Sequence, residues 1–190
     1  MSKTGSVRII GGDFRGRKLP VLNIEGLRPT SDRVRETLFN WLQFDIVNAS
    51  CLDVFAGSGS LGFESLSRGA KSVVMLESDR SNINQLEKNK ALLEVDNLNI
   101  YQVDSMQWLN TNNNNQSFDL VFIDPPFKQG LMATVIERLF NEQRVHKDSM
   151  LYLEQEKNLE WPNFPENWSC FKEKTTSQVR YGLFKYQNVK

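Results

Sequence analysis

The sequence holds few of the residues that build metal centres or disulfides. Its 190 residues include two cysteines, Cys51 and Cys170, and a single histidine, His146. The two cysteines are far apart and show no CxxC spacing, so neither a zinc site nor a disulfide framework is expected. This cysteine usage is typical of a reducing compartment, and we expect a cytoplasmic protein without a bound metal.

Long apolar runs and strong compositional bias are also missing. No run approaches the length of a membrane span, and the opening MSKTGSVRII lacks the apolar core of a signal peptide. Glycine and proline are not in excess, with 39% apolar and 24% charged residues, which argues against collagen-like, coiled-coil or disordered chains. We expect one soluble domain with a substantial core.

Charge is unevenly distributed although the formal net charge is zero. Residues 1–40 carry eight Lys or Arg against four Asp or Glu, and residues 171–190 carry five against one. Basic ends around an acidic centre are consistent with a polyanion-binding surface, and equally with solvated termini.

The first forty residues predict a hairpin and a helix. Val7–Val21 reads as two short strands around glycine-rich turns. Thr30 or Ser31 can cap a helix whose apolar face includes Val34 and Leu38 and whose other face offers Arg33 and Arg35. We therefore expect a basic β-hairpin extension over residues 1–26 and a main domain over residues 27–190.

From Cys51 onward the pattern alternates between strands and helices. Strands are expected near 51–55, 72–77, 98–103, 119–123 and 149–154, and helices near 61–68, 80–93, 105–110 and 131–141. This alternation predicts an α/β fold with a mostly parallel sheet covered on both faces. Segments 168–175 and 179–187 predict a closing antiparallel hairpin.

A glycine-rich loop joins the strand near 51–55 to the next helix. The glycines of Asp53-Val54-Phe55-Ala56-Gly57-Ser58-Gly59-Ser60-Leu61-Gly62 satisfy GxGxxG, which fits a dinucleotide or an S-adenosylmethionine (SAM) site. A phosphate-binding P-loop is excluded, because Phe63 stands where that motif needs lysine. Asp53 favours SAM, since a carboxylate can pair with the methionine ammonium but would repel a pyrophosphate.

Acidic residues follow two further strands. Glu77 is placed to bind both ribose hydroxyls of the cofactor, and Asp104 to receive the adenine amino group. Each acid alone would be read as a helix cap or a solvated strand end. With the glycine loop, the three acids fall on the carboxyl edge where open sheets bind ligands, and SAM becomes the favoured cofactor.

The strand near 119–123 ends in Asp124-Pro125-Pro126-Phe127. The prolines fix the backbone and remove two N–H donors, which leaves the Asp124 carboxylate and the Pro125 carbonyl as acceptors. These acceptors can hold the hydrogens of an exocyclic base amine and direct its lone pair, while Phe127 stacks on the base. Ring-carbon methylation is disfavoured, because neither cysteine lies in a suitable loop.

The sequence resembles the bacterial guanine-N2 methyltransferases of 16S ribosomal RNA, the RsmD family, over nearly its whole length. The resemblance rests on Arg8-Ile9-Ile10-Gly11-Gly12, Arg28–Glu36, the glycine loop, Glu77, the Asp124–Phe127 motif and Gln178–Gly182. It implies a class I, Rossmann-like methyltransferase fold with a seven-stranded sheet, and methylation of one guanine N2 in assembled or assembling small ribosomal subunits.

The implied site has three parts. Cofactor contacts are expected from Thr30, Arg33, Asp53, Phe55, Ala56, Gly57, Ser58, Gly59, Glu77, Asp104 and Ser105, although helix capping and a solvated helix face account equally well for Thr30 and Arg33. Catalysis is expected from Asp124, Pro125, Pro126 and Phe127. RNA contacts are expected from Arg8, Arg15, Arg17, Lys18 and Arg28. The implied partners are 16S rRNA and ribosomal proteins, with the enzyme a monomer and no membrane involved.

Three alternatives stay open. An adenine-N6 DNA methyltransferase would use the same Asp-Pro-Pro-Phe chemistry, but this chain has little room for a target-recognition segment. A non-catalytic scaffold with the same fold would not need the motif. A nicotinamide oxidoreductase remains compatible with the glycine pattern.

Overall fold

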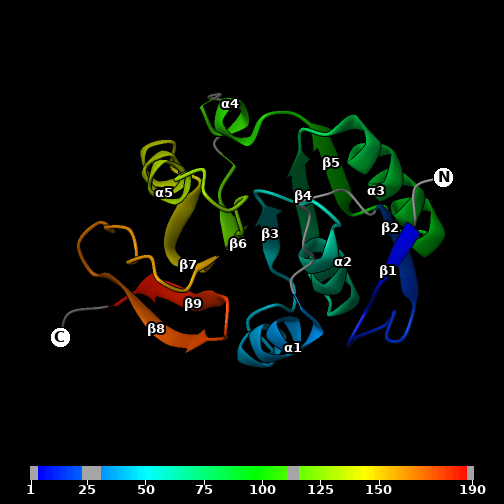
Figure 1. Ribbon diagram of the computed structural model, residues 1–190, viewed down its shortest axis with the longest axis horizontal. Helices are drawn as coiled ribbons and strands as arrows, with labels where there is room; N and C mark the ends of the chain where they lie inside the picture. The colour runs from blue at the N-terminus through cyan, green and yellow to red at the C-terminus, as the bar shows by residue number, and fades with distance from the viewer. Residues whose placement is uncertain (1–3, 23–30, 111–115, 188–190) are drawn as a thin grey trace.

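The computed structural model describes residues 4–22, 31–110 and 116–187 and forms one α/β domain with an N-terminal hairpin (Figure 1). The strands are β1 (Thr4–Arg8), β2 (Lys18–Leu22), β3 (Ser50–Asp53), β4 (Ser72–Glu77), β5 (Leu98–Gln102), β6 (Phe118–Ile123), β7 (Val145–Glu156), β8 (Trp168–Thr175) and β9 (Val179–Tyr186). The helices are α1 (Asp32–Trp41), α2 (Ser60–Ser67), α3 (Arg80–Leu93), α4 (Ser105–Leu109) and α5 (Met132–Asn141).

The main sheet has the strand order β5-β4-β3-β6-β7-β9-β8. Strands β3 to β7 are parallel, and β9 pairs antiparallel with both β7 and β8. The predicted mostly parallel sheet with a closing antiparallel hairpin is thereby confirmed. The chain moves outward from β3 to β5 and then returns to β6, so the strand order reverses between β3 and β6.

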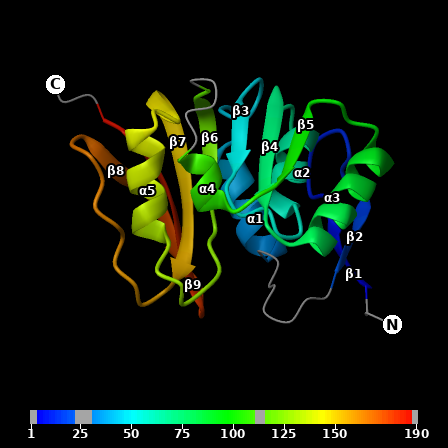
Figure 2. The same cartoon turned by 90° about the horizontal axis from the view of Figure 1, so that it is seen from above.

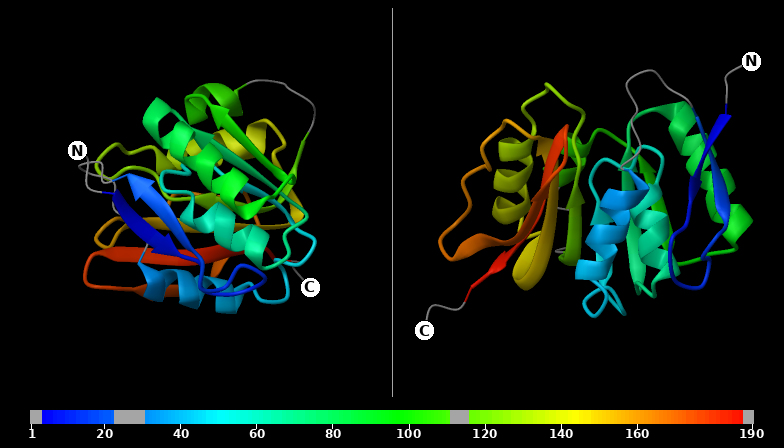
Figure 3. Two further views of the ribbon diagram at one scale, coloured as in Figure 1. Left: turned by 90° about the vertical axis from the view of Figure 1, so that its right-hand side faces the viewer. Right: turned by 60° about the horizontal axis from the view of Figure 1, so that its bottom comes forward.

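Helices cover both faces of the sheet. One core packs α1, α2 and the inner side of α3 against alternate residues of β3, β4 and β6, and the other packs α4 and α5 against the residues between them. Figure 2 shows α4 and α5 on one side and α1 and α2 on the other, and the right-hand view of Figure 3 brings α1 and α2 forward. This alternation follows from the period of two along a strand.

Helix α1 begins where the sequence predicts. The side chain of Ser31 caps it by accepting a hydrogen bond from the Val34 N–H, and Val34 and Leu38 are buried as expected. The prediction for Arg35 was wrong, because this side chain is only 1% exposed and points into the protein. Its Nη2 donates to the Arg8 carbonyl at 2.9 Å.

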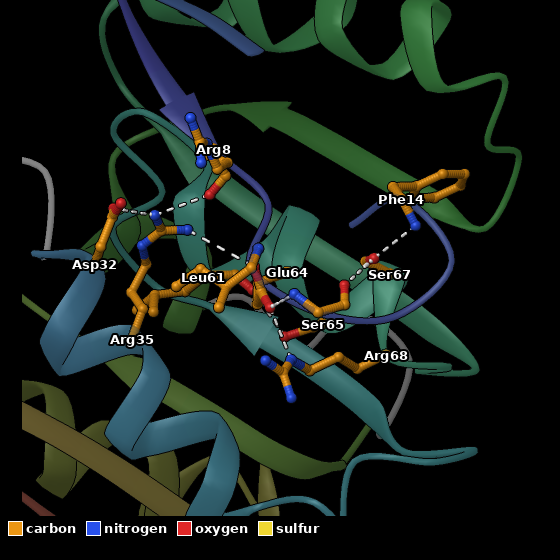
Figure 4. A network of polar contacts seen from close by, with 11 residues as sticks. Arg8, Phe14, Asp32, Arg35, Leu61, Glu64, Ser65, Ser67 and Arg68 are labelled. Carbon is orange, nitrogen blue, oxygen red and sulfur yellow. Dashed lines mark hydrogen bonds and ion pairs between the residues drawn. The ribbon is translucent and has the colours of Figure 1, made fainter. Parts of the chain in front are cut away.

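Arg35 faces two carboxylates, Asp32 of its own helix, whose Oδ1 accepts a hydrogen bond from Arg35 Nη2 at 2.5 Å, and buried Glu64 on α2. Glu64 is fully buried, and its carboxylate accepts hydrogen bonds from the N–H groups of Ile10 and Gly11 at 2.7 and 2.9 Å and from Arg68 Nε at 2.7 Å (Figure 4). Arg35 Nη1 lies 3.7 Å from Glu64 Oε2. This network joins the hairpin, α1 and α2, and it supplies the partners that a buried charge requires.

The hairpin of β1 and β2 also docks directly on the helices. Gly12 has φ +75° in the turn, and a Cβ there would lie 1.7 Å from the Ser67 carbonyl oxygen, so only glycine fits. The Asp13 N–H donates to the same oxygen at 2.7 Å, and Asn89 Nδ2 of α3 donates to the Pro20 carbonyl at 2.9 Å. The expected division at residue 26 lies outside the described residues.

A search for transmembrane segments across the described residues finds no helix with the length and apolar character needed to cross a bilayer.

We expect Glu64→Ala to destabilise the protein by ~3–5 kcal/mol, because it removes the buried carboxylate that faces Arg35 and Arg68 and leaves two hairpin N–H groups without an acceptor. Arg35 keeps its ion pair with exposed Asp32. Urea unfolding measures this loss. Amide exchange at Ile10 and Gly11 should accelerate as well.

The matched control is Glu36→Ala, which removes an exposed carboxylate from α1. That change should stay within ~0.5 kcal/mol of the wild type. Equal stability of the Glu64 variant and the control would show that the buried network does not hold the hairpin.

Candidate active site

A cleft of about 1270 Å³ opens at the carboxyl edge of the parallel strands. It is lined by the loops that follow β3, β4, β5 and β6, by the first turns of α1, by the end of β7 and by the turn between β8 and β9. The cleft includes the point where the strand order reverses, which is the place where open α/β sheets bind ligands.

The glycine loop forms one wall of this cleft. Phe55, Ala56, Gly57 and Ser58, which were expected to contact the cofactor, line it. Gly59 was also expected to contact the cofactor, but it is buried behind the loop and is not among the lining residues. Its φ is +76° and a Cβ there would lie 2.5 Å from Leu86, so Gly59 allows the loop to turn into α2.

Asp53 lies at the end of β3 and is 2% exposed. Burial raises the pKa of its carboxyl group to about 7, against the lowering effect of hydrogen bonds from the backbone N–H groups of Gly62 and Phe55. The negative charge of Glu77 contributes to the rise. Asp53 therefore fixes the shape of the glycine loop and also borders the cleft.

Glu77 connects two loops at the end of β4. Its carboxylate accepts hydrogen bonds from the Gly57 N–H at 3.0 Å, from the Asp79 N–H at 2.8 Å and from Asn82 Nδ2 at 3.4 Å. These contacts hold the carboxylate at the cleft wall next to the glycine loop. A carboxylate accepts about four hydrogen bonds, so this position is compatible with a ribose contact.

Asp104 and Ser105 lie beyond β5 and also line the cleft. Asp104 caps α4 by accepting a hydrogen bond from the Gln107 N–H at 2.9 Å, which is the helix-cap interpretation considered for a single acid. The Ser105 hydroxyl donates to the Val54 carbonyl at 2.5 Å and ties the start of α4 to the end of β3.

The Asp-Pro-Pro-Phe segment forms the wall that follows β6. Asp124 is half-buried, Pro125 is buried, and the Phe127 ring is 41% exposed beside the cleft. The Lys128 N–H donates to Glu156 Oε1 at 2.7 Å, which tethers this loop to the end of β7. The motif thus presents carboxylate and carbonyl acceptors together with an accessible aromatic ring.

The remaining predicted residues divide into three groups. Arg33 is exposed and lines the cleft at the start of α1. Arg8, Arg15, Arg17 and Lys18 are exposed on the hairpin and do not line the cleft. Thr30 and Arg28 lie outside the described residues.

Sequence reasoning missed two parts of the cleft. Glu154 is the last residue of the expected strand 149–154, as Glu77 is of the expected strand 72–77, and a search for acids at strand ends would have found it. Residues 174–179, in the turn between β8 and β9, and nearby Tyr181 also line the cleft. Gln178–Gly182 contributed to the family resemblance, but it carried no indication of a place in the cleft, and only the return of the antiparallel hairpin brings these residues there.

The residues of this cleft fit SAM. An open glycine loop, a desolvated carboxyl group beside it and further carboxylates along one edge match a ligand that carries an ammonium, a ribose and an adenine. Among the side chains that the structure describes, no group of three or more His, Cys, Asp and Glu is placed to hold a metal ion.

The fold and this site define a class I, SAM-dependent type of methyltransferase. The solved structure of the Escherichia coli protein yhhF superposes with a TM-score of 0.87 at 45% identity, covering 96% of this chain and 99% of that one.

The sequence comparisons narrow the class to one family. A family model described as "Conserved hypothetical protein 95" matches residues 7–185. "Ribosomal RNA small subunit methyltransferase D" of Haemophilus influenzae is 50% identical over 97% of this chain and 95% of its own, and the Escherichia coli protein of the same name is 46% identical over 96% and 91%. The chain belongs to this family, the RsmD family, which confirms the resemblance noted from the sequence.

We expect the affinity for SAM to rise as the pH rises from 5.5 to 7.5. The pKa of Asp53 is about 7, so the carboxylate that favours a cationic methionine ammonium forms only near neutral pH. The gain is at most roughly tenfold per pH unit below 7. The same shift lowers the free energy of unfolding of the unliganded protein as the pH rises from 3.8 to about 7, because the folded state retains a proton that the unfolded state releases, and the loss persists at higher pH.

Calorimetric titration at several pH values tests this dependence. Asp53→Asn should bind SAM more weakly at pH 7.5 and lose the rise between pH 5.5 and 7. A wild-type affinity that is flat over this range would contradict a role for the Asp53 charge in cofactor binding.

Proposed function

We propose that this chain transfers a methyl group from SAM to the exocyclic N2 of one guanine of 16S rRNA within the small ribosomal subunit. The observation that carries the proposal is the shared cleft, in which the glycine loop and the Asp124–Phe127 segment follow the carboxyl ends of the adjacent parallel strands β3 and β6. The names of the relatives at 46–50% identity support rRNA as the substrate class. The proposal places the enzyme in the cytoplasm, where these subunits assemble.

The cofactor half of the cleft consists of the loops after β3, β4 and β5. Residues 55–58 would lie along SAM, Asp53 and Arg33 would border its methionine end, Glu77 would bind its ribose, and Asp104 with Ser105 would border its adenine. When bound, SAM supplies a methyl group that its sulfonium already makes reactive. The protein therefore contributes mainly by positioning.

The base half consists of the loop after β6. The lone pair of an exocyclic base amine is delocalised into the ring, so the amine is a weak nucleophile. Asp124 and the Pro125 carbonyl would accept its two hydrogens, hold the nitrogen nearer to tetrahedral geometry and turn its lone pair toward the cofactor. Phe127 would stack on the base, as accessible aromatic rings do in RNA recognition.

RNA binding would depend on local rather than overall charge. The chain is neutral in sum, but Arg8, Arg15, Arg17 and Lys18 cluster on the exposed hairpin. Part of the Arg17 guanidinium is already engaged, since it lies 5.2 Å from the Phe14 ring centre and 3.4 Å from the Leu92 carbonyl. Further affinity would come from ribosomal proteins near the target guanine.

The experiment that tests this function is transfer of labelled methyl from SAM to small subunits from a strain that lacks this gene, followed by nucleoside analysis. We expect label in N2-methylguanosine at a single rRNA position. Label in N6-methyladenosine would overturn the guanine assignment and retain the amine chemistry. Absence of label with SAM still bound would favour a scaffold with the same fold.

We expect Asp124→Ala to abolish labelling while SAM affinity stays within a few fold, because the carboxylate contacts the base amine and not the cofactor. Calorimetry with SAM on the same preparation supplies the control for folding. Retained turnover in this variant would refute the amine-holding mechanism.

We expect Arg15→Gln with Arg17→Gln to weaken binding to small subunits and to lower the slope of log affinity against log salt by up to ~2, because each lost phosphate contact removes about one released counterion. Filter binding at several salt concentrations measures both quantities.

The matched control is Lys71→Gln with Lys147→Gln, which removes two exposed positive charges outside the hairpin. It keeps the same net charge as the test variant. Equal weakening by the two double variants would show that overall charge, and not the hairpin, determines RNA binding.

A further inference from the structure

A second acidic residue, Glu154, lines the cleft on the strand next to Asp124. Strands β6 and β7 are parallel, with Ile123 opposite Leu153, so Asp124 and Glu154 are the next residues of adjacent strands. Neighbouring strands lie about 4.8 Å apart. Both acids line the cleft. Asp124 comes two residues after Phe122, and Glu154 two residues after Tyr152. The rings of Phe122 and Tyr152 pack against each other in the core on the α1 side of the sheet.

Glu154 is held in place from the core side. It is 5% exposed, and the fully buried Tyr152 hydroxyl donates a hydrogen bond to its Oε2 at 2.6 Å. Burial raises the pKa of Tyr152, and the negative charges of Glu154 and then Asp124 raise it further, which places both carboxylates near the same phenol.

Carboxylates that line a partly buried cleft favour a ligand that presents N–H donors to them. A ligand edge with two adjacent N–H donors therefore matches two neighbouring carboxylates. Guanine has such an edge, because its N1–H donor lies next to its N2 amine. Adenine presents an unprotonated N1 acceptor beside its N6 amine, so a carboxylate opposite N1 would attract guanine and repel adenine.

We propose that Glu154 is the base-selecting residue, and that its carboxylate accepts the N1–H of the guanine whose N2 amine is held by Asp124 and Pro125. This inference rests on the proposed function and deepens it. It assigns the transfer chemistry to the end of β6 and the choice between guanine and adenine to the end of β7.

The test compares guanine with 2-aminopurine at the target position. 2-Aminopurine retains the N2 amine but has an unprotonated N1 and lacks O6. A synthetic oligonucleotide carries either base at the position that the wild-type enzyme methylates. It is ligated into the rRNA, and small subunits are reconstituted from the product. Methyl transfer gives kcat/KM for each substrate, and the preference is the ratio of the two.

We expect the wild type to prefer guanine, and Glu154→Gln to lower that preference by roughly 10- to 100-fold, because the glutamine amide can donate to the unprotonated N1 of 2-aminopurine. The absence of O6 from 2-aminopurine affects the wild type and the Glu154→Gln variant alike, so it cancels when their preferences are compared. Both substrates are measured on one preparation, so a smaller folded fraction also cancels. An unchanged preference, or an equal loss on both substrates, would overturn the assignment.

The matched control is Tyr152→Phe, which removes the hydroxyl bound to Glu154 and leaves the carboxylate. Its preference should remain that of the wild type, and a loss as large as that of Glu154→Gln would reduce Glu154 to a structural partner of Tyr152. If the proposed function itself is wrong, the wild type will leave guanine N2 unlabelled in native subunits. That result differs from an unchanged base preference, which would contradict only the role of Glu154.

Discussion

The reversal of strand order between β3 and β6 is the constraint on which the site depends. Because strands β3 to β7 are parallel, their carboxyl ends meet at one edge of the sheet, and the chain leaves β3 in one direction and β6 in the other. The two loops therefore diverge and leave a cleft between them. Most of the expected cofactor residues lie at or just after the ends of β3, β4 and β5, and the expected catalytic residues follow β6.

Three buried acids perform different tasks because their surroundings differ. Glu64 accepts three hydrogen bonds, from the Ile10 and Gly11 N–H groups and Arg68 Nε, and faces the Arg35 guanidinium at 3.7 Å, so its charge is compensated within the core. Asp53 receives two backbone N–H groups, and burial raises the pKa of its carboxyl group to about 7. Glu154 receives the hydroxyl of Tyr152 and borders the cleft. Only Asp53 and Glu154 are therefore placed to respond to a ligand.

Much of the fold could be predicted because strand and helix periods, turn residues and caps are local signals. The expected helix 80–93 matches α3, and the expected hairpin segments 168–175 and 179–187 match β8 and β9 closely. The glycine loop and the Asp124–Phe127 segment were found because their residues are contiguous in sequence.

The remainder depends on residues that are distant in sequence. Arg35 was expected on the outer face of α1 because charged residues usually are, and Glu64, twenty-nine positions later, makes its burial possible. Gly59 matched the loop motif, but it is buried where a side chain would collide with Leu86 of α3, and it does not line the cleft. The turn at 174–179 reaches the cleft only because β9 pairs back on β7.

The most direct test of the account is a structure of this protein on the small ribosomal subunit with S-adenosylhomocysteine. The account predicts that the ribose of S-adenosylhomocysteine lies beside Glu77 and that one guanine lies at the ends of β6 and β7. The guanine N2 should lie about 3 Å from the Asp124 carboxylate and the Pro125 carbonyl oxygen, and its N1 should lie within hydrogen-bond distance of Glu154. A base bound away from the ends of β6 and β7, or an adenine in that position, would contradict it.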